Sequence, residues 1–192
     1  QSFNAKGKLE STSKQKVISK SVSGGDVEAT IHNDVYDKKG KLQHSSDYKI
    51  KCKDGVFMVD MQTMINPEQT DAYASMEVTV DGDFLEIPSN PTVGQTLKDA
   101  SLNIKFGTAE TSIMTMRIKI TNRKVEAKEN ITTPAGTFEC YVISFDIETR
   151  LIFSIKASVK EWYSKGVGMV RSEHYNRSGK LMGYSELSSI KK

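Results

Sequence analysis

Apolar and polar side chains alternate with a period of two in run after run of this sequence, and that alternation restricts its fold more than any other feature. A β-strand directs successive side chains to opposite faces of a sheet, so each run predicts a strand with one buried face. The clearest run spans residues 42–53, where one face is mainly apolar and the other is mainly lysine. Comparable runs lie at 27–35, 56–61, 76–80, 114–120 and 151–159.

Glycine, asparagine and aspartate occur between these runs, at positions where tight turns need them. Asp81-Gly82-Asp83 and Asn122-Arg123 are each predicted to reverse the chain between two strands. Two longer turns, 36–42 and 175–181, match in type at nearly every position. Each starts with an Asx residue and has glycine where the backbone requires positive φ. Regular hairpins of this kind predict a mostly antiparallel sheet.

The runs together predict about ten to thirteen strands and at most one or two short helices. A short helical turn is the candidate structure within 66–74, where Asn66 is suited to cap and Pro67 to begin it. A loop is the alternative. A sheet of this size usually curls or splits, so we expect a mainly β fold, a curved half-barrel or open barrel, ahead of a two-sheet sandwich. The 192 residues are long enough for one core, which predicts a single domain over 1–192.

Charge and hydropathy exclude several classes of partner. The net charge of +3 is spread over interleaved basic and acidic residues, which argues against nucleic-acid binding. No apolar run reaches the roughly 18 residues of a membrane-spanning helix. The polar stretch 1–7 is typical of an exported protein after signal-peptide cleavage, so we expect export. The sequence does not indicate the oligomeric state.

The two cysteines, Cys52 and Cys140, fit no zinc-binding spacing. Both lie on predicted strands beside apolar residues, so two buried free thiols are expected. A disulfide in an oxidising compartment is the alternative, and it depends on whether the two strands adjoin.

Four motifs in the second half of the chain carry a family resemblance: Thr92-Val93-Gly94-Gln95-Thr96-Leu97-Lys98-Asp99, Ile120-Thr121-Asn122-Arg123-Lys124-Val125, Thr132-Thr133-Pro134-Ala135-Gly136-Thr137-Phe138-Glu139-Cys140-Tyr141 and Glu161-Trp162-Tyr163-Ser164-Lys165-Gly166-Val167-Gly168-Met169-Val170-Arg171. Together they resemble the TapB-like exported proteins of Gram-negative bacteria, most clearly over residues 93–187. The resemblance implies export to the periplasm or cell surface and a curved sheet similar to lipoprotein carriers of the LolA/LolB type. It implies no activity and no catalytic residues.

The candidate catalytic and cofactor-binding motifs each lack a residue or a context that the chemistry requires. Gly166-Val167-Gly168 lacks the third glycine of a dinucleotide fingerprint and leads into a strand, so we interpret the glycines as positions of a bend or bulge. Gly183-Tyr184-Ser185 lacks the second glycine of a nucleophile elbow. The histidines, His32, His44 and His174, lie on three separate strands. We therefore predict no catalytic residue, no cofactor and no metal site.

Methionine adapts to irregular apolar ligands, and the chain has eight of them. Ordinary core filling is the alternative role. Residues on strand faces that could line the concave side of the sheet are the candidate ligand contacts: Met58, Met76, Met114, Met116, Phe153, Ile155 and Tyr163. Trp162 is expected to anchor the core instead.

Three functions follow from these observations. The first is a non-enzymatic exported protein that holds a lipid or other apolar molecule in the concavity of its sheet. The second is a cell-envelope module that binds another protein, with a core filled by its own side chains. The third is an enzyme of unrecognised type. A continuous apolar cavity would favour the first, and a concave face filled by side chains such as Phe and Leu would favour the second.

Overall fold

The structure, a computed structural model, describes residues 1–61, 77–107 and 112–191. Within these residues thirteen strands form one antiparallel sheet and no α-helix is present, which confirms the predicted fold class. The candidate helix at 66–74 lies outside the described residues. The strands are β1 (Ser2–Asn4), β2 (Leu9–Ser23), β3 (Asp26–Asp37), β4 (Leu42–Lys53), β5 (Val56–Asp60), β6 (Glu77–Gly82), β7 (Phe84–Pro88), β8 (Ala100–Gly107), β9 (Ser112–Thr133), β10 (Gly136–Arg150), β11 (Ser154–Ser164), β12 (Gly168–Tyr175) and β13 (Leu181–Glu186).

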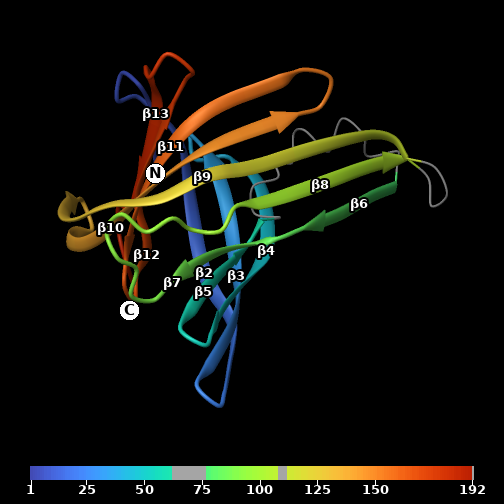
Figure 1. Cartoon of the computed structure of the whole chain (residues 1–192). Helices are drawn as coiled ribbons and strands as arrows, with labels where there is room; N and C mark the ends of the chain where they lie inside the picture. The colour runs from blue at the N-terminus through green and yellow to red at the C-terminus, as the bar shows by residue number, and fades with distance from the viewer. Residues whose placement is uncertain (62–76, 108–111, 192) are drawn as a thin grey trace.

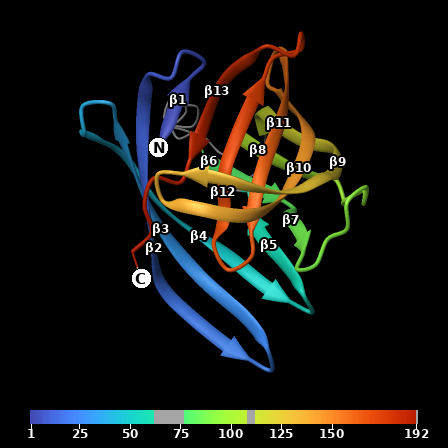
Figure 2. The same ribbon diagram turned by 90° about the vertical axis from the view of Figure 1, so that its left-hand side faces the viewer.

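The sheet curls into a nearly closed barrel, as Figures 1 and 2 show. Its strand order is β6-β8-β9-β10-β11-β12-β13-β1-β2-β3-β4-β5-β7. The first and last strands in this order, β6 and β7, are consecutive in the chain. Residues 77–88 therefore form one interrupted strand whose first half pairs with β8 and whose second half pairs with β5. This change of partner links the two edges of the sheet through the chain itself.

The corner between β6 and β7 corrects the predicted hairpin at Asp81-Gly82-Asp83, because the two strands do not pair. The Asp83 amide donates to the Ser101 carbonyl at 2.9 Å, and Asp83 Oδ2 accepts from the Ser101 amide at 2.8 Å and from Ser101 Oγ at 3.1 Å. A Cβ atom on Gly82 would lie 2.4 Å from Leu102 Cδ1. The acidic and glycine residues thus fix a bend against β8 rather than a reversal.

Asn122-Arg123 also differs from the prediction, because β9 runs through it as one strand of 22 residues. Asn122 adopts a φ of 57°, and the register with β10 shifts between Ser144 and Asp146. The side-chain Nδ2 of Asn122 donates to Asp146 Oδ2 at 2.8 Å. A β-bulge changes which face of a strand is buried. Accordingly, Met116, Ile118 and Ile120 are buried before the bulge, and Arg123 and Val125 are buried directly after it.

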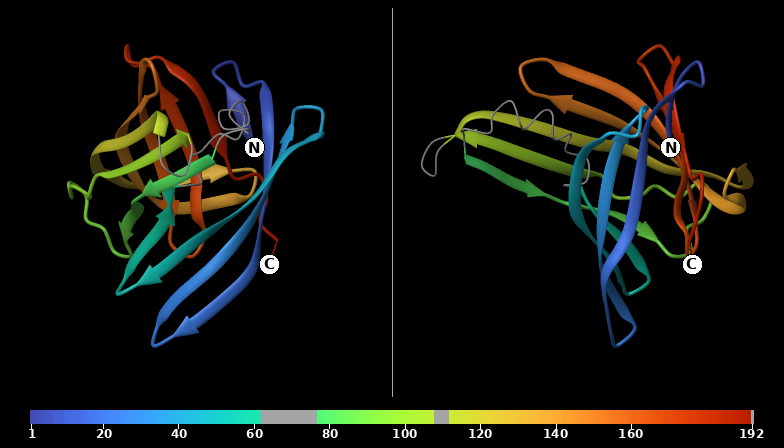
Figure 3. Two further views of the ribbon diagram at one scale, coloured as in Figure 1. Left: turned by 90° about the vertical axis from the view of Figure 1, so that its right-hand side faces the viewer. Right: turned by 180° about the vertical axis from the view of Figure 1, so that it is seen from behind.

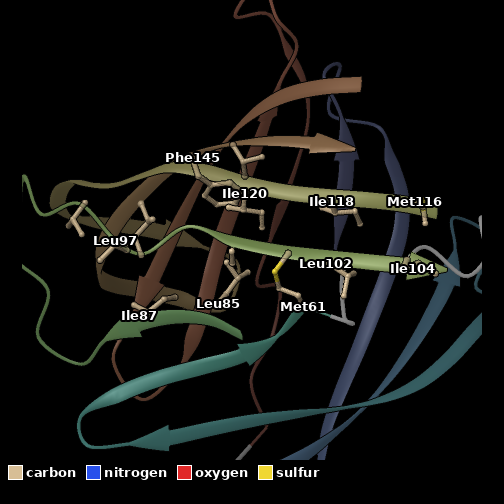
Figure 4. Close-up of a cluster of buried hydrophobic side chains, with 14 of the residues drawn as sticks. Met61, Leu85, Ile87, Leu97, Leu102, Ile104, Met116, Ile118, Ile120 and Phe145 are labelled. Atoms are coloured by element: carbon tan, nitrogen blue, oxygen red, sulfur yellow. The ribbon is translucent and has the colours of Figure 1, made fainter. Parts of the chain in front are cut away.

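The main core lies inside the curled sheet (Figure 4). It is built from the inward side chains of β7, β8, β9, β10 and β11, together with Leu97 and Met61. Leu102, Ile104 and Phe106 on β8 have no exposed surface. Alternation along β8 and β9 thus has the predicted consequence of one buried face.

A second apolar cluster lies on the other face of β10. Trp162 packs there with Cys140, Val142 and Val170, and its indole donates to Glu129 Oε1 at 2.7 Å. The predicted role of Trp162 as a core anchor is confirmed. Both cysteines are free thiols; Cys140 is buried and Cys52 only half-buried.

Antiparallel order places several connections at the same end of the sheet, which we call the turn end. It carries the turns 4–8, 37–41 and 176–180 and the tip of the β10–β11 hairpin at 151–153. Figures 1 and 3 show the β1–β2 and β12–β13 turns and the β10–β11 tip on the upper side of the molecule. The connections at 24–25, 54–55, 89–99 and 165–167 lie at the opposite end.

Candidate functional site

The structure brings only part of the predicted cavity lining together. Met116 is buried in the main core, and Met114 and Tyr163 pack against that core from β9 and β11. Met58 is half-buried on β5, opposite Lys51 and Glu86. Met76 lies outside the described residues.

Phe153 and Ile155 lie apart from this group, at the tip of the β10–β11 hairpin. Their exposed fractions are 82% and 71%. On the same face of β11, Val159 is buried and Ala157 is half-buried, so exposure rises steadily toward the tip. The hairpin therefore extends the apolar inner face beyond the body of the barrel.

Side chains of the protein itself occupy the interior. Leu85, Leu97, Leu102, Phe106 and Phe145 all belong to the main core and are buried. Two open hollows lie elsewhere on the sheet. One of about 360 Å³ lies beside the turns 4–8 and 37–41, and one of about 260 Å³ is lined mainly by polar residues of β2, β3 and β4.

An ionisable group interrupts the apolar interior at Arg123. The β-bulge at Asn122 turns this side chain inward, where it is 2% exposed. Its Nη1 donates to the Lys98 carbonyl at 2.6 Å, while its Nε finds no hydrogen-bond partner among the residues that the structure describes. Burial lowers the pKa of Arg123, because desolvation disfavours the charged form. A buried donor without a partner is uncommon and is a reason to look for a ligand.

Glu161 and Tyr163 occupy successive inward positions on β11, near Arg123. The Tyr163 hydroxyl donates to Glu161 Oε2 at 2.8 Å. Burial raises the pKa of Glu161, although the bond from Tyr163 and the charge of Arg123 oppose that rise. Burial and the adjacent Glu161 carboxylate raise the pKa of Tyr163 well above its ordinary value.

This cluster of Arg123, Glu161 and Tyr163 can hold a proton or bind the anionic group of a ligand. The sequence indicates Tyr163 but not Arg123, which it places in a predicted turn. The alternation along β9 shifts by one residue after Asn122, and this shift is the signal that identifies Arg123 as an inward residue. The residues that the structure describes contain no group of His, Cys, Asp and Glu side chains arranged to hold a metal ion.

Comparison with known proteins places the chain in a family. Residues 1–187 match the family described as DUF3108-like. The chain belongs to the DUF3108-like family. The match covers both halves of the barrel, whereas the motif resemblance was clearest over 93–187. No functionally curated protein matched the sequence.

Two solved structures resemble this DUF3108-like chain over nearly its whole length. A "putative exported protein with YmcC-like fold" from Bacteroides fragilis NCTC 9343 has 26% identity and a TM-score of 0.80, and the match covers 100% of this chain and 92% of that one. A "putative lipoprotein" from Parabacteroides distasonis ATCC 8503 has 27% identity and a TM-score of 0.81, with 99% and 92% covered. Both descriptions indicate the cell envelope, and neither names an enzymatic activity. In the part of the chain described, no helix has the length and hydropathy to cross a membrane.

Proposed function

We propose that this DUF3108-like protein is a non-enzymatic, exported component of the cell envelope that acts through its outer surface, as an interaction module with a self-filled core. The observation that carries the proposal is the interior, where Leu102, Ile104 and Phe106 have no exposed surface. Large apolar side chains are instead exposed at the β10–β11 tip. Exposed apolar groups that the fold does not need are typical of interaction surfaces.

Native mass spectrometry of protein purified without detergent tests this function. The mass of the chain alone is expected, and organic extraction of the same sample should release no stoichiometric lipid. A lipid recovered in a fixed ratio to the protein would overturn the self-filled core.

A second candidate function is the binding of an amphipathic lipid inside the sheet, and the unpartnered Nε of Arg123 favours it. The guanidinium would bind the anionic head group, and the main core would contact the acyl chain. In that case Arg123→Met should abolish recovery of the lipid. Arg117→Met is the matched control, because Arg117 is exposed on the same strand. Lipid recovery that does not depend on Arg123 would contradict this head-group site.

We further propose the periplasm or the periplasm-facing membrane surface as the location, and membership of the TapB-like group within the DUF3108-like family. The two structural neighbours, one described as an exported protein and the other as a lipoprotein, support an envelope location. Fractionation of cells that express the full gene would test it: recovery with cytoplasmic markers would exclude export.

A further inference from the structure

The tip of the β10–β11 hairpin exposes a compact apolar group, Ile152, Phe153 and Ile155, which we call the apolar tip. Ile152 is 75% exposed, about as much as its two neighbours. The Leu151 amide donates to the Phe153 carbonyl at 3.3 Å, which keeps the connection short. Such a tip presents bulky side chains at the end of a narrow ribbon, a shape suited to penetrate a soft apolar medium.

Basic side chains flank the apolar tip. Arg150 at the end of β10 lies directly opposite Arg117 on β9, and both are exposed. Like charges directly opposite each other destabilise a sheet. Arg117 bonds to the neutral Asn103 side chain, so this contact does not offset the repulsion. An anionic surface next to the tip would offset the repulsion between Arg117 and Arg150.

The three turns at the same end share one design. In each of the turns 4–8, 37–41 and 176–180, the Oδ1 atom of the first residue accepts hydrogen bonds from two backbone amides. Each turn has glycine at the fourth position, with φ between 73° and 81°, and lysine at the fifth. This geometry directs the remaining side chains outward.

Together the three turns expose seven basic side chains: Lys6, Lys8, Lys38, Lys39, Lys41, Arg177 and Lys180. The hairpins β12–β13, β1–β2 and β3–β4 are consecutive in the sheet. Because neighbouring strands lie about 4.8 Å apart, successive turns are separated by about 10 Å. A net charge of +3 for the chain conceals this concentration at one end.

We infer that the turn end docks on the surface of a lipid bilayer that contains anionic phospholipid, with the apolar tip inserted at the headgroup boundary and the basic turns against the phosphates. The inference rests on the proposed function, because it names the partner of the outer surface. Two features at one end of the molecule carry it, exposed apolar side chains and a row of basic turns. Membrane-surface binding combines these same two contributions, buried apolar area and attraction to anionic lipid.

Vesicle co-sedimentation of the full chain tests this inference. Phosphatidylcholine vesicles with about a third phosphatidylglycerol should bind the protein, pure phosphatidylcholine should bind it far less, and added salt should weaken binding. Each base near an anionic surface contributes about fivefold to partitioning. Lys38→Gln/Lys39→Gln/Lys41→Gln should therefore lower binding about a hundredfold. Phe153→Ser/Ile155→Ser should lower it at least about tenfold.

Matched controls come from the rest of the sheet. Val22→Ser/Val93→Ser changes exposed apolar residues at the opposite end, and Lys16→Gln/Lys20→Gln/Lys53→Gln removes the same charge from β2 and β4. Both controls should bind anionic vesicles like the unchanged protein. The inference would be overturned if the control variants lost as much vesicle binding as the test variants. Binding that does not depend on phosphatidylglycerol would also overturn it. If the protein bound neither type of vesicle, the inference would also be overturned, and the tip would be assigned to a protein partner.

Depth of insertion gives an independent readout. Phe153→Trp should be quenched by phospholipids brominated on their acyl chains, whereas Trp162 of the unchanged protein, buried beneath Val142 and Val170, should not. An unquenched tip tryptophan on bound protein would contradict insertion. Failure of the self-filled core is detected separately, because lipid extraction without vesicles reports on the interior alone.

Discussion

Gly82 and Arg123 show how single residues set this barrel. Gly82 lies against Leu102 where β6 leaves β8, and any side chain there would overlap it. Arg123 is turned inward by the bulge at Asn122 and places a cation among apolar side chains. The first residue allows the close approach to Leu102 at the end of β6, and the second creates the one interior site with an unpartnered donor among the described residues.

Gly82→Ala is expected to lower the free energy of unfolding by about 1–3 kcal/mol, the usual cost of overpacking a buried contact. Urea denaturation followed by Trp162 fluorescence would measure it. Thr79→Ala changes an exposed residue on the same strand. It should change the free energy of unfolding by no more than about 0.5 kcal/mol. Equal stability of Gly82→Ala and the unchanged protein would mean that the β6–β7 corner tolerates a side chain.

Glu161→Gln tests the interior cluster through pH. Burial raises the pKa of Glu161 above its ordinary value of 4.5, so the folded protein binds this proton more tightly than the unfolded chain. The bound proton of Glu161 therefore stabilises the folded protein below pH 4.5. This stabilisation is lost as the pH rises through the raised pKa of the folded state. Because Gln does not titrate, the stability of Glu161→Gln relative to the unchanged protein should increase as the pH rises from 4.5.

Urea denaturation of both proteins across this pH range supplies the measurement. Comparing the two removes the effect of the many other carboxylates, which titrate alike in both. A difference that stays constant with pH would show that Glu161 has an ordinary pKa.

At the scale of elements, the repeated turn explains why three hairpins end alike. The Asx side chain replaces water at two backbone amides, and glycine accepts the positive φ that follows. The turns at 36–42 and 175–181 were predicted from this chemistry. The third copy, at 4–8, follows the same pattern and was missed because β1 is a strand of only three residues.

Asn176→Ala should destabilise the protein by about 1 kcal/mol, since the Ser178 and Lys180 amides lose their acceptor. Thermal or urea unfolding would show the change. Arg177→Ala in the same turn removes an exposed side chain and serves as the control, with little expected effect. A larger loss from Arg177→Ala would contradict this account of the turn.

At the scale of the whole molecule, one continuous sheet holds both apolar clusters. The main core fills its inside, and the Trp162 cluster covers part of its outside. Opening of one strand pair exposes little of either cluster, so the buried thiol of Cys140 should become accessible only when the sheet as a whole unfolds. Burial, followed by repulsion from Glu129 and Glu139, also raises its pKa and slows its reaction further.

Thiol labelling would check this expectation. Cys52→Ser should show almost no reaction in buffer and one reactive thiol in denaturing urea. Cys140→Ser should react in buffer, because Cys52 is only half-buried. Rapid labelling of Cys140 without denaturant would indicate local opening of β10.

Alternation and turn chemistry determined much of this protein from sequence alone: the strand class, most strand bounds, the antiparallel pairing and the core role of Trp162. These features depend on neighbours along the chain. Tertiary structure alone decided that 77–88 changes partner at Asp83, that Asn122 is a bulge, and that Arg123 meets Glu161 and Tyr163. It also decided that the apolar tip and the basic turns share one end. Contacts between residues far apart in sequence set those four features, and a periodic pattern carries no information about which distant strand lies next to it.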